Sequence, residues 1–374
     1  MGTPTKILLG AVVIAGVAVA LMSGLEGDQL EDQEVDVALL NVTTEVLATG
    51  FSLPVAVAVI EADEYLVTDR IGHLHHHVAG ETVRLEGGPN SEIFNIGAGI
   101  AGGLMDVSLH PDFAANGLVY VSFFSPETSM AVARFDFSDR VIRELEIIFE
   151  TNASAVGATI EWQDSEHFFL THATTNPQLP QDLSSDAGKI HRLLADGSVP
   201  GDNPTFEGAD GQTSIWSIGH RNGQGLYAED GVLYATEDGD IGGDELNVIE
   251  SGGNYGFPFV TSGDVFDFRG APGDIGPTIA PVRTWNSLSL GPTGLVRLVD
   301  SSFPGLDGHF LFGALATEQL IGFDLATGDT TVLLTDVGRI RDVDQLPDGD
   351  IVIVVESTAD SASNGQLIRL SPAQ

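Results

Sequence analysis

The stretch Arg341-Asp-Val-Asp-Gln-Leu-Pro-Asp-Gly-Asp-Ile-Val-Ile-Val-Val355 shows the unit from which most of the chain is built. It consists of a run with apolar residues, a Pro/Asp/Gly turn and a second apolar run. The Asp348-Gly349 dipeptide tolerates the positive φ of a tight hairpin turn, so the unit predicts two antiparallel strands. The unit recurs along the chain, with copies that begin near Pro54, Leu104, Gly157, Gln224, Gly294 and Arg341.

These six copies predict the fold. Their spacing suits blades of four strands, and repeats of this kind are typical of propellers. We therefore expect an all-β protein, a six-bladed β-propeller with four antiparallel strands per blade, and no amphipathic helix longer than two turns. A strand near Thr44–Ala48 is expected to close the ring by joining the C-terminal blade. One or two irregular sandwiches are the alternative. The clearest expected strands are Val55–Ile60, Tyr65–Thr68, Val119–Phe124, Val132–Phe137, Thr159–Trp162, Phe168–Thr171, Val232–Thr236, Phe310–Gly313, Leu320–Leu325 and Ile351–Val355.

Composition excludes several classes of protein. The 374 residues carry 15 Lys+Arg and 54 Asp+Glu, a formal net charge of −39, and no Cys. Such a charge repels nucleic acid, and the absence of Cys excludes disulfides and zinc–thiolate sites. With 43% hydrophobic residues the chain has enough apolar side chains to fold. An acidic surface with only two lysines resembles that of proteins adapted to high salt, where charge repulsion is screened.

The N-terminus predicts an exported protein. Lys6 precedes the apolar run Ile7–Met22, so residues 1–23 are expected to be a signal peptide or an N-terminal membrane anchor. Residues 24–41 are expected to be an acidic linker, and residues 42–374 the propeller. The expected location is periplasmic, extracellular or anchored to the outer face of the membrane. Any membrane contact would be made only through the N-terminal segment.

Several motifs follow one another in a recognisable order along the chain. They are Gly103-Leu-Met-Asp-Val-Ser-Leu-His110, Gln181-Asp-Leu-Ser-Ser185, Gly188–Pro204, Ile215-Trp-Ser-Ile-Gly-His-Arg-Asn-Gly-Gln-Gly225, Thr236-Glu-Asp-Gly-Asp-Ile-Gly-Gly-Asp-Glu-Leu-Asn247, Gly253-Asn-Tyr-Gly256 and Gly338-Arg-Ile-Arg-Asp342. Through these motifs the chain resembles the soluble pyrroloquinoline quinone (PQQ)-dependent aldose sugar dehydrogenases, the glucose/sorbosone dehydrogenase family, which implies a six-bladed propeller. The resemblance spans nearly the whole mature chain.

The resemblance implies where PQQ binds. Arg221 and Asn222 match family positions beside the reactive quinone oxygens, and Arg221 would stabilise the oxyanion of the reduced cofactor. Arg339 and Arg341 match the pair that holds the cofactor carboxylates. Guanidinium groups suit this task because they bind carboxylates through paired hydrogen bonds, and i, i+2 spacing on a strand places both on one face. Ion pairing of these arginines with surface carboxylates is the alternative.

Calcium is the second ligand that the resemblance implies. The loop containing Gly239 and Asp240 matches the one whose backbone carbonyls hold the cofactor-bound Ca²⁺. Glu245 and Tyr255 match a second, structural Ca²⁺ site, with Asp244 adjacent. Hard oxygen donors are the ligands that Ca²⁺ takes. An acidic turn in an acidic protein is the alternative.

The chain departs from the family at the catalytic base. The family His, which takes the proton of the substrate hydroxyl, aligns with Ser154, and an unassisted Ser hydroxyl is no base near neutral pH. Two further cofactor contacts align with Ala101 and Ala316. His172 ends the next strand of the same blade, so it is the candidate replacement base; a polar loop residue is the alternative.

Other histidines are expected to be structural or solvated. His73, His75 and His77 alternate along a strand and share one face, for which a solvated surface is the preferred interpretation and a metal site the lesser one. His110 and His220 lie inside fold motifs and are expected to form structural hydrogen bonds.

Two functions of different class follow. The first is an exported PQQ- and Ca²⁺-dependent dehydrogenase that oxidises an aldose sugar at C1 to a lactone, passes electrons to an external acceptor and has an altered base. The second is a non-catalytic propeller that binds a carbohydrate or protein partner. The retained arginines favour the first, whereas Ser154 and Ala101 favour the second.

Overall fold

The computed structural model describes residues 42–85, 103–124, 129–153, 156–209, 211–263, 275–285, 289–356 and 364–373. The chain divides into two compact units, Met1–Glu34 and Val35–Gln374. The first unit lies outside the described residues, as do the predicted signal or anchor segment (1–23) and the acidic linker (24–41). Within the described part of the chain, no helix is long and apolar enough to cross a membrane.

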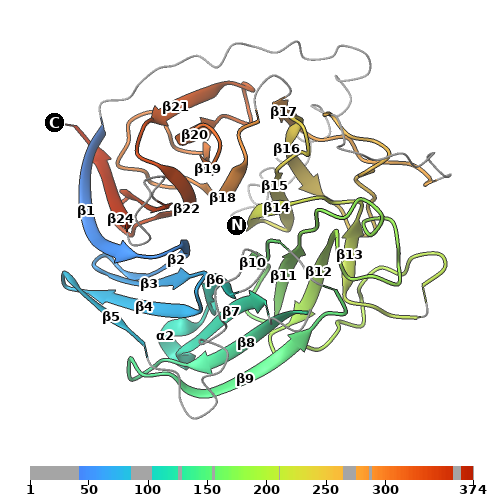
Figure 1. The fold of residues 1–374 in the computed structure, drawn as a ribbon, viewed down its shortest axis with the longest axis horizontal. Helices are drawn as coiled ribbons and strands as arrows, with labels where there is room; N and C mark the ends of the chain where they lie inside the picture. Colours follow the sequence, from blue (N-terminus) through green and yellow to red (C-terminus); the bar gives the residue numbers. More distant parts are fainter. Residues whose placement is uncertain are drawn as a thin grey trace, which may run out of the picture. The chain divides into compact units, whose positions relative to one another are not determined.

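Six sheets of four antiparallel strands surround a common axis (Figure 1). The only helix among the described residues is the short α2 (Phe113–Asn116). Blade 1 contains β2 (Pro54–Glu61), β3 (Glu64–Asp69), β4 (His73–Val78) and β5 (Glu81–Arg84); blade 2 contains β6 (Gly103–Leu109), β7 (Leu118–Phe124), β8 (Met130–Asp136) and β9 (Arg143–Glu150); blade 3 contains β10 (Ile160–Trp162), β11 (His167–His172), β12 (Lys189–Leu194) and β13 (Ile215–Ile218).

The remaining three blades follow the same order along the chain. Blade 4 contains β14 (Gly223–Glu229), β15 (Val232–Glu237), β16 (Asp244–Ile249) and β17 (Arg283–Trp285); blade 5 contains β18 (Pro292–Arg297), β19 (Phe310–Ala314), β20 (Gln319–Phe323) and β21 (Thr330–Leu334); blade 6 contains β22 (Arg339–Gln345), β23 (Ile351–Glu356), β24 (Gly365–Pro372) and β1 (Val42–Phe51). The first strand of each repeat is the one nearest the axis (Figure 1). The predicted six-bladed propeller is confirmed.

The ring is closed by a strand from the other end of the sequence. β1 pairs antiparallel with β24 from Val42↔Pro372 to Phe51↔Gly365, so the outermost strand of blade 6 comes from the N-terminal side. The expectation that the strand near Thr44–Ala48 joins the C-terminal blade is confirmed. The Phe51 ring is fully buried and packs with residues of blades 6 and 1.

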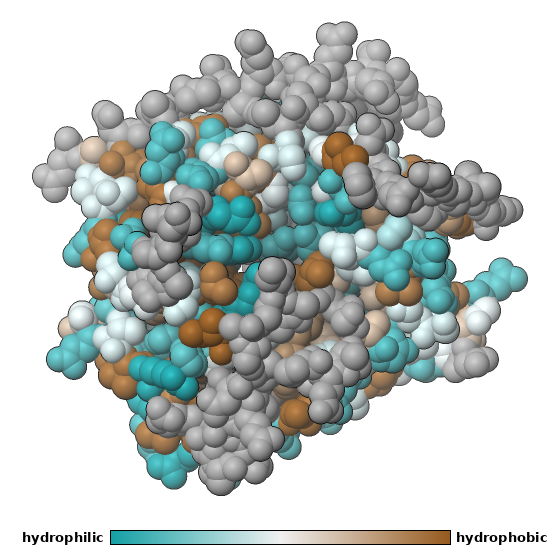
Figure 2. Space-filling model, in the orientation of Figure 1, coloured by the Kyte–Doolittle hydropathy of each residue, from teal (hydrophilic) through white to brown (hydrophobic). Residues whose placement is uncertain are grey.

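The hydrophobic core lies between consecutive blades. One cluster of buried side chains joins Leu66 of blade 1 to Phe135 of blade 2, and each of the other clusters likewise combines two neighbouring blades. Burying these apolar surfaces drives the stacking of the blades, because a single blade cannot cover both of its faces. The exposed large hydrophobic residues of the described surface are all Val or Ile, and Figure 2 shows hydrophilic residues between hydrophobic ones.

Carboxylates cross-link the inner strands around the axis. Asp342 of blade 6 accepts a hydrogen bond from the Val57 backbone of blade 1 (2.9 Å), and Asp106 of blade 2 accepts one from Ile160 of blade 3 (2.6 Å). Glu161 of blade 3 accepts one from the Ala228 backbone of blade 4 (3.0 Å). These bonds satisfy inner-strand N–H groups that face the axis rather than a neighbouring strand.

Burial raises the pKa of these axial carboxyl groups. Together with Asp344 they line a central cavity that is open to solvent. Burial raises the pKa of Asp106 to about 7, of Glu161 to about 8 and of Asp344 to about 6, because a charge is poorly solvated there. Burial and the nearby Asp106 raise the pKa of Asp342 well above its usual range.

The raised pKa values predict that the fold loses stability as pH rises. Between about 4.3, the pKa of a Glu in the unfolded chain, and about 8, the pKa of folded Glu161, the folded state holds a proton that the unfolded state has lost. The free energy of unfolding should fall across this window, by up to about 1.4 kcal/mol per pH unit for each such group. Urea denaturation at several pH values measures it.

Glu161→Gln should flatten this slope, because the amide oxygen can still accept the Ala228 bond without titrating. Glu166→Gln on an exposed turn is the matched control and should keep the wild-type slope. A free energy of unfolding that rises from pH 5 to pH 8 in the wild type would contradict the assignment.

Candidate functional site

Arg339 and Arg341 share one carboxylate at the start of β22. Arg341 Nε donates to Glu356 Oε2 at 2.6 Å, and Arg339 Nε lies 3.5 Å from the same oxygen. Glu356 ends the neighbouring strand β23, and an irregularity between Ile340 and Asp342 interrupts the pairing of the two strands. The structure thus brings the two predicted arginines to one side of the strand. It also shows that both pair with a carboxylate of the chain itself.

Arg70, which sequence reasoning missed, joins this pair. It follows β3, and its pKa is lowered by burial and by Arg339 while Glu356 opposes the shift. Burial and the nearby Arg70 lower the pKa of Arg341 to about 10. We call Arg70, Arg339, Arg341 and Glu356 the arginine cluster. Three guanidinium groups around one carboxylate leave an excess of positive charge, which is notable in a chain with a net charge of −39.

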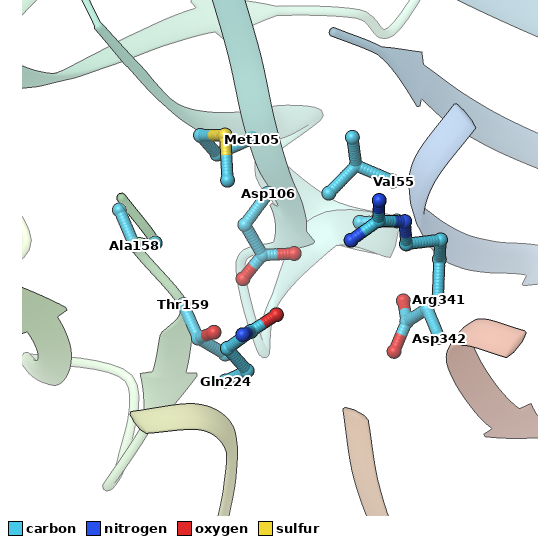
Figure 3. A pocket seen from close by; sticks show the side chains of 10 residues that line it. Val55, Met105, Asp106, Ala158, Thr159, Gln224, Arg341 and Asp342 are labelled. Carbon is cyan, nitrogen blue, oxygen red and sulfur yellow. The ribbon is translucent and has the colours of Figure 1, made fainter. Parts of the chain in front are cut away.

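A solvent-open hollow lies on the axis beside the arginine cluster. Arg341 of blade 6, Asp106 of blade 2, Thr159 of blade 3 and Gln224 of blade 4 converge on it (Figure 3). Gly157 also lines it, and a Cβ at Gly157 would stand 3.4 Å from Asn222 Oδ1. Val55 of blade 1 lines it as well, so the hollow combines groups from five blades. One predicted cofactor residue besides Arg341, Asn222, borders it.

Arg221 and Asn222 are held by an acidic loop. Arg221 donates to the Asp238 carbonyl at 2.7 Å and to Asp240 Oδ1 at 2.8 Å. Asn222 Nδ2 donates to Asp238 Oδ2 at 3.0 Å, whereas its Oδ1 is buried and accepts no hydrogen bond from the described residues. A buried acceptor without a donor is uncommon in folded proteins, so Asn222 has capacity left for a bound group.

A buried network fixes the backbone of Arg221. Glu237 accepts from the Arg221 N–H at 3.0 Å and contacts His220 Nδ1 at 2.5 Å, while His220 Nε2 contacts Ser217 Oγ at 2.8 Å. The His220 ring stacks on Tyr255 at 4.6 Å. The order Ser, His, Glu is that of a hydrolase triad, but Ser217 is 0% exposed, so no acyl substrate can meet it. The network positions the site, as expected for His220.

His110 is also structural, as expected. Its Nδ1 accepts from the Asp112 backbone at 3.0 Å, and its Nε2 lies 3.1 Å from the Ser165 carbonyl on the neighbouring blade.

Three of the five residues predicted for calcium, Gly239, Glu245 and Tyr255, line a second hollow. Glu237, Asp238 and Arg221 line it with them. Burial and the Glu237 charge raise the pKa of Glu245 to about 7. Two desolvated carboxylates close together are stabilised by a cation, so the donor set suits Ca²⁺.

Three residues predicted for calcium, Asp244, Tyr255 and Asp240, already use their side chains in contacts within the protein. Asp244 accepts hydrogen bonds from the backbone N–H of Gly239 (2.8 Å) and Gly291 (2.9 Å), and thereby fixes the acidic loop. The Tyr255 hydroxyl donates to the Val248 carbonyl at 2.5 Å and accepts a hydrogen bond from the Glu250 backbone N–H at 2.8 Å, so any contact of Tyr255 with a cation falls to its backbone. Asp240 forms an ion pair with Arg221.

His172, the candidate base, is enclosed. It ends β11, is 0% exposed, and its ring lies 6.0 Å from that of His191. A substrate hydroxyl reaches His172 only if the surrounding loops move. Ser154 and Ala101 lie outside the described residues. Ala316 is in the turn after β19, where its N–H bonds to the Leu290 carbonyl at 2.8 Å.

The expectation of a solvated histidine face on β4 was wrong. His77 is 3% exposed, hydrogen-bonds Thr82 Oγ1 at 2.8 Å and stacks on Tyr65. His73 and His75 are half-buried beside Asp69. This face is covered because the Tyr65 ring stacks on His77 and the Phe51 ring packs edge-on against His75.

The fold and the site define a six-bladed propeller with an arginine cluster and an acidic loop at the axis. Residues 51–369 match the family model of glucose/sorbosone dehydrogenases. The aldose sugar dehydrogenase YliI of Escherichia coli is 30% identical over 355 residues, covering 88% of this chain and 93% of its own. The quinoprotein glucose dehydrogenase B of Acinetobacter calcoaceticus is 29% identical over 193 residues, 42% of this chain and 40% of its own.

A solved structure agrees. The apo form of the soluble aldose sugar dehydrogenase of Escherichia coli superposes with a TM-score of 0.77 at 29% identity, covering 89% of this chain and all of that one. The chain belongs to the glucose/sorbosone dehydrogenase family. Its relatives support a sugar dehydrogenase-like propeller of the PQQ type.

Calcium should stabilise the fold through the second hollow. A ligand that binds only the folded state at 100 times its dissociation constant adds about 2.7 kcal/mol to the free energy of unfolding. Chelation at constant high salt should therefore lower the melting temperature. Glu245→Gln should shrink the difference between chelated and Ca²⁺-loaded protein, whereas Glu150→Gln at the exposed end of β9 should not. Equal melting temperatures with and without chelator in the wild type would exclude a stabilising calcium site in this hollow.

Proposed function

We propose that this chain is a PQQ- and Ca²⁺-dependent dehydrogenase that oxidises aldose sugars at C1 to lactones and passes the electrons to an external acceptor. The arginine cluster is the observation that carries this proposal. Its excess positive charge lies at the axis of a strongly acidic protein, where Arg341 is largely buried. Keeping guanidinium groups desolvated is unfavourable unless an anion compensates them. A tricarboxylate such as PQQ would supply that compensation.

The residues present fit PQQ. Arg70, Arg339 and Arg341 would hold carboxylates through charge-assisted hydrogen bonds, with Glu356 keeping the guanidinium groups in place. Asn222 Oδ1 is a hydrogen-bond acceptor that no described residue uses, and Arg221 brings a fixed positive charge next to it. When bound, PQQ would supply the two-electron acceptor, which no side chain of this protein supplies.

The acidic loop fits a calcium ion beside the cofactor. Glu237, Asp238 and Asp240 surround Arg221, so this part of the site carries more negative than positive charge. A bound Ca²⁺ would balance the excess, with Glu245 and the Tyr255 backbone serving the second ion. The names of the relatives, aldose sugar dehydrogenase and quinoprotein glucose dehydrogenase, support the cofactor and the substrate class.

The proton of the substrate hydroxyl needs an acceptor. Among the described residues, His172 is the candidate by sequence, because the position of the family base is Ser154. Its burial at the end of β11 requires a local opening before it can act. If no such opening occurs, the chain binds its ligands without turnover. That is the second candidate function, a non-catalytic propeller for a carbohydrate or protein partner, and the sequence at Ser154 and Ala101 favours it.

Export is part of the proposal. It rests on Lys6 and the apolar run Ile7–Met22, which suit a signal peptide or an anchor. Such a protein would act in the periplasm, outside the cell or on the outer face of the membrane.

PQQ binding should depend on the arginine cluster. Each charge-assisted hydrogen bond contributes about 1.5–3 kcal/mol, so Arg339→Ala and Arg341→Ala should each weaken PQQ binding by roughly tenfold or more. Arg143→Ala on the exposed strand β9 is the matched control, since Arg143 forms an ion pair with Asp139 on the surface (3.0 Å). Fluorescence titration of the apo-protein with PQQ in Ca²⁺ measures the affinities. Equal affinity in all four proteins would exclude the cluster as the cofactor site.

Turnover should identify the base. If His172 takes the proton, dye reduction with aldoses should rise with pH through a near-neutral pKa, and His172→Ala should abolish it while PQQ still binds. If the site lacks a base, wild-type turnover should be weak, and Ser154→His should raise it. Strong activity in both the wild type and His172→Ala would show that another group is the base.

A further inference from the structure

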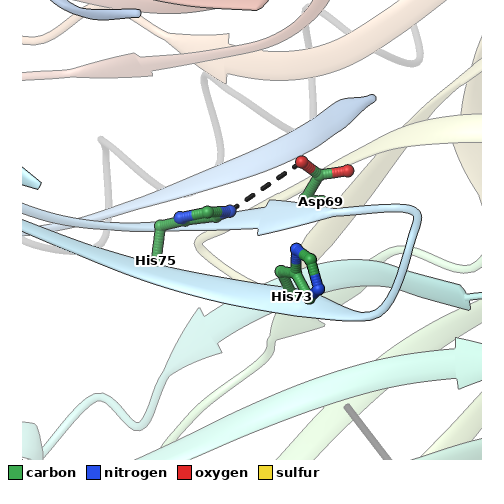
Figure 4. A group of neighbouring side chains, drawn as sticks. All are labelled: Asp69, His73 and His75. Atoms are coloured by element: carbon green, nitrogen blue, oxygen red, sulfur yellow. Dashed lines mark ion pairs between the residues drawn. The ribbon is translucent and has the colours of Figure 1, made fainter. Parts of the chain in front are cut away.

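Asp69, His73 and His75 converge at one hairpin of blade 1 (Figure 4). Asp69 ends β3 and is the pairing partner of His73, which begins β4 after the turn. His75 follows two residues later, so it shares the strand face of His73. Of the described residues, these three are the group of His and acidic side chains whose ligand atoms all lie within 4.8 Å of one another.

The carboxylate of this group is rigid. Asp69 is 1% exposed and accepts hydrogen bonds from the backbone N–H of Ser52 (2.8 Å), Leu53 (2.9 Å) and Ile71 (3.3 Å). Oδ1 accepts two of these bonds and Oδ2 only one, so Oδ2, the oxygen that faces His75, keeps a lone pair for a metal ion. This arrangement is how ligating carboxylates are held in metal sites, by hydrogen bonds from the surrounding protein.

His75 points an unsatisfied nitrogen toward that carboxylate. Its Nε2 is buried, makes no hydrogen bond within the described protein and lies 3.8 Å from Asp69 Oδ2. The distance is too long for a direct hydrogen bond but suits two ligands of one ion. Phe51 packs edge-on against the ring at 5.1 Å and fixes its orientation. The His73 ring lies 6.0 Å from the His75 ring.

We propose that Asp69, His73 and His75 bind one divalent transition-metal ion of borderline softness, such as Zn²⁺. Two imidazoles and one carboxylate are a usual ligand set for Zn²⁺, with a water in the fourth position. Zn²⁺ ligands stand about 3.3 Å apart at bond lengths of about 2.0 Å. Rotation of the half-buried His73 side chain on the surface of the hairpin would close the remaining gap. The partial exposure of His73 also gives the ion and its water a path.

The ion would tie together the seam of the propeller. Asp69 already holds Ser52 and Leu53, which connect β1 of blade 6 with β2 of blade 1. A metal bound to Asp69 on one side and to β4 on the other would clamp the point where the ring closes. The site is chemically distinct from the proposed Ca²⁺ sites, because Ca²⁺ prefers oxygen ligands and imidazole suits Zn²⁺. It does not depend on the proposed dehydrogenase activity.

The test is a calorimetric titration of the purified chain with Zn²⁺. Excess Ca²⁺ and high salt are kept constant so that the many surface carboxylates are occupied or screened. We expect saturable binding of one ion per chain. His73→Ala and His75→Ala should each lower the affinity by about tenfold or more. His167→Ala is the matched control, because His167 forms a lone His–carboxylate pair with Asp164 on blade 3, at 3.0 Å.

Two further measurements keep the result decisive. Co²⁺ in place of Zn²⁺ should give visible absorption bands of a four-coordinate nitrogen and oxygen site, lost in His75→Ala. Asp69→Asn keeps an oxygen acceptor for the backbone bonds, so the variant should fold, as its melting curve checks, but should bind Zn²⁺ more weakly. Absence of saturable binding would overturn the proposal. Binding that survives the double change of His73→Ala and His75→Ala would overturn it as well.

Discussion

Hydrogen bonds between the backbone of one blade and a side chain of its neighbour hold the inner strands in place, and the site depends on them. The carboxylates of Asp342, Asp106 and Glu161 make such bonds around the axis. Side-chain hydroxyls link neighbouring blades as hydrogen-bond donors. Thr68 donates to the Met105 carbonyl and Ser122 donates to the Ala158 carbonyl, both at 2.7 Å. Apolar packing drives the blades together but is not directional, so these polar bonds set the register between blades.

This register decides which residues meet. Most functional groups lie at the start of an inner strand or just before it: Arg339 begins β22, and Asn222 precedes β14. Arg70 lies in the turn after β3, the second strand of its blade. A Cβ at Gly103, the start of β6, would overlap the Arg70 carbonyl, so only glycine allows this approach. Residues far apart in the sequence thus collect at one end of the axis. The positive and negative groups there hold each other in fixed positions before any ligand binds, which reduces the reorganisation that binding requires.

The sequence predicted the fold well and the site in part. The six repeat starts, the expected strands and the ring-closing strand are all found, because strand periodicity and Asp-Gly turns are local signals. Arg70 and Glu356 were missed, since their meeting with Arg341 depends on the contact between blades 1 and 6. The only sequence signal for Arg70 as a site residue was its position as a basic residue just after the expected strand Tyr65–Thr68. The burial of His77 and His172 was also beyond reach, because alternation along a strand shows a shared face but not what covers it.

The proposed binding site for PQQ is the arginine cluster at the axis. A crystal structure of the purified protein with PQQ and Ca²⁺ tests it most directly. The account predicts electron density for PQQ over the axial hollow, with its carboxylates on Arg339, Arg341 and Arg70 and with Ca²⁺ at the Glu237–Asp240 loop. PQQ bound elsewhere, or an axial hollow without PQQ at saturating concentration while Arg341 keeps its bond to Glu356, would contradict the account.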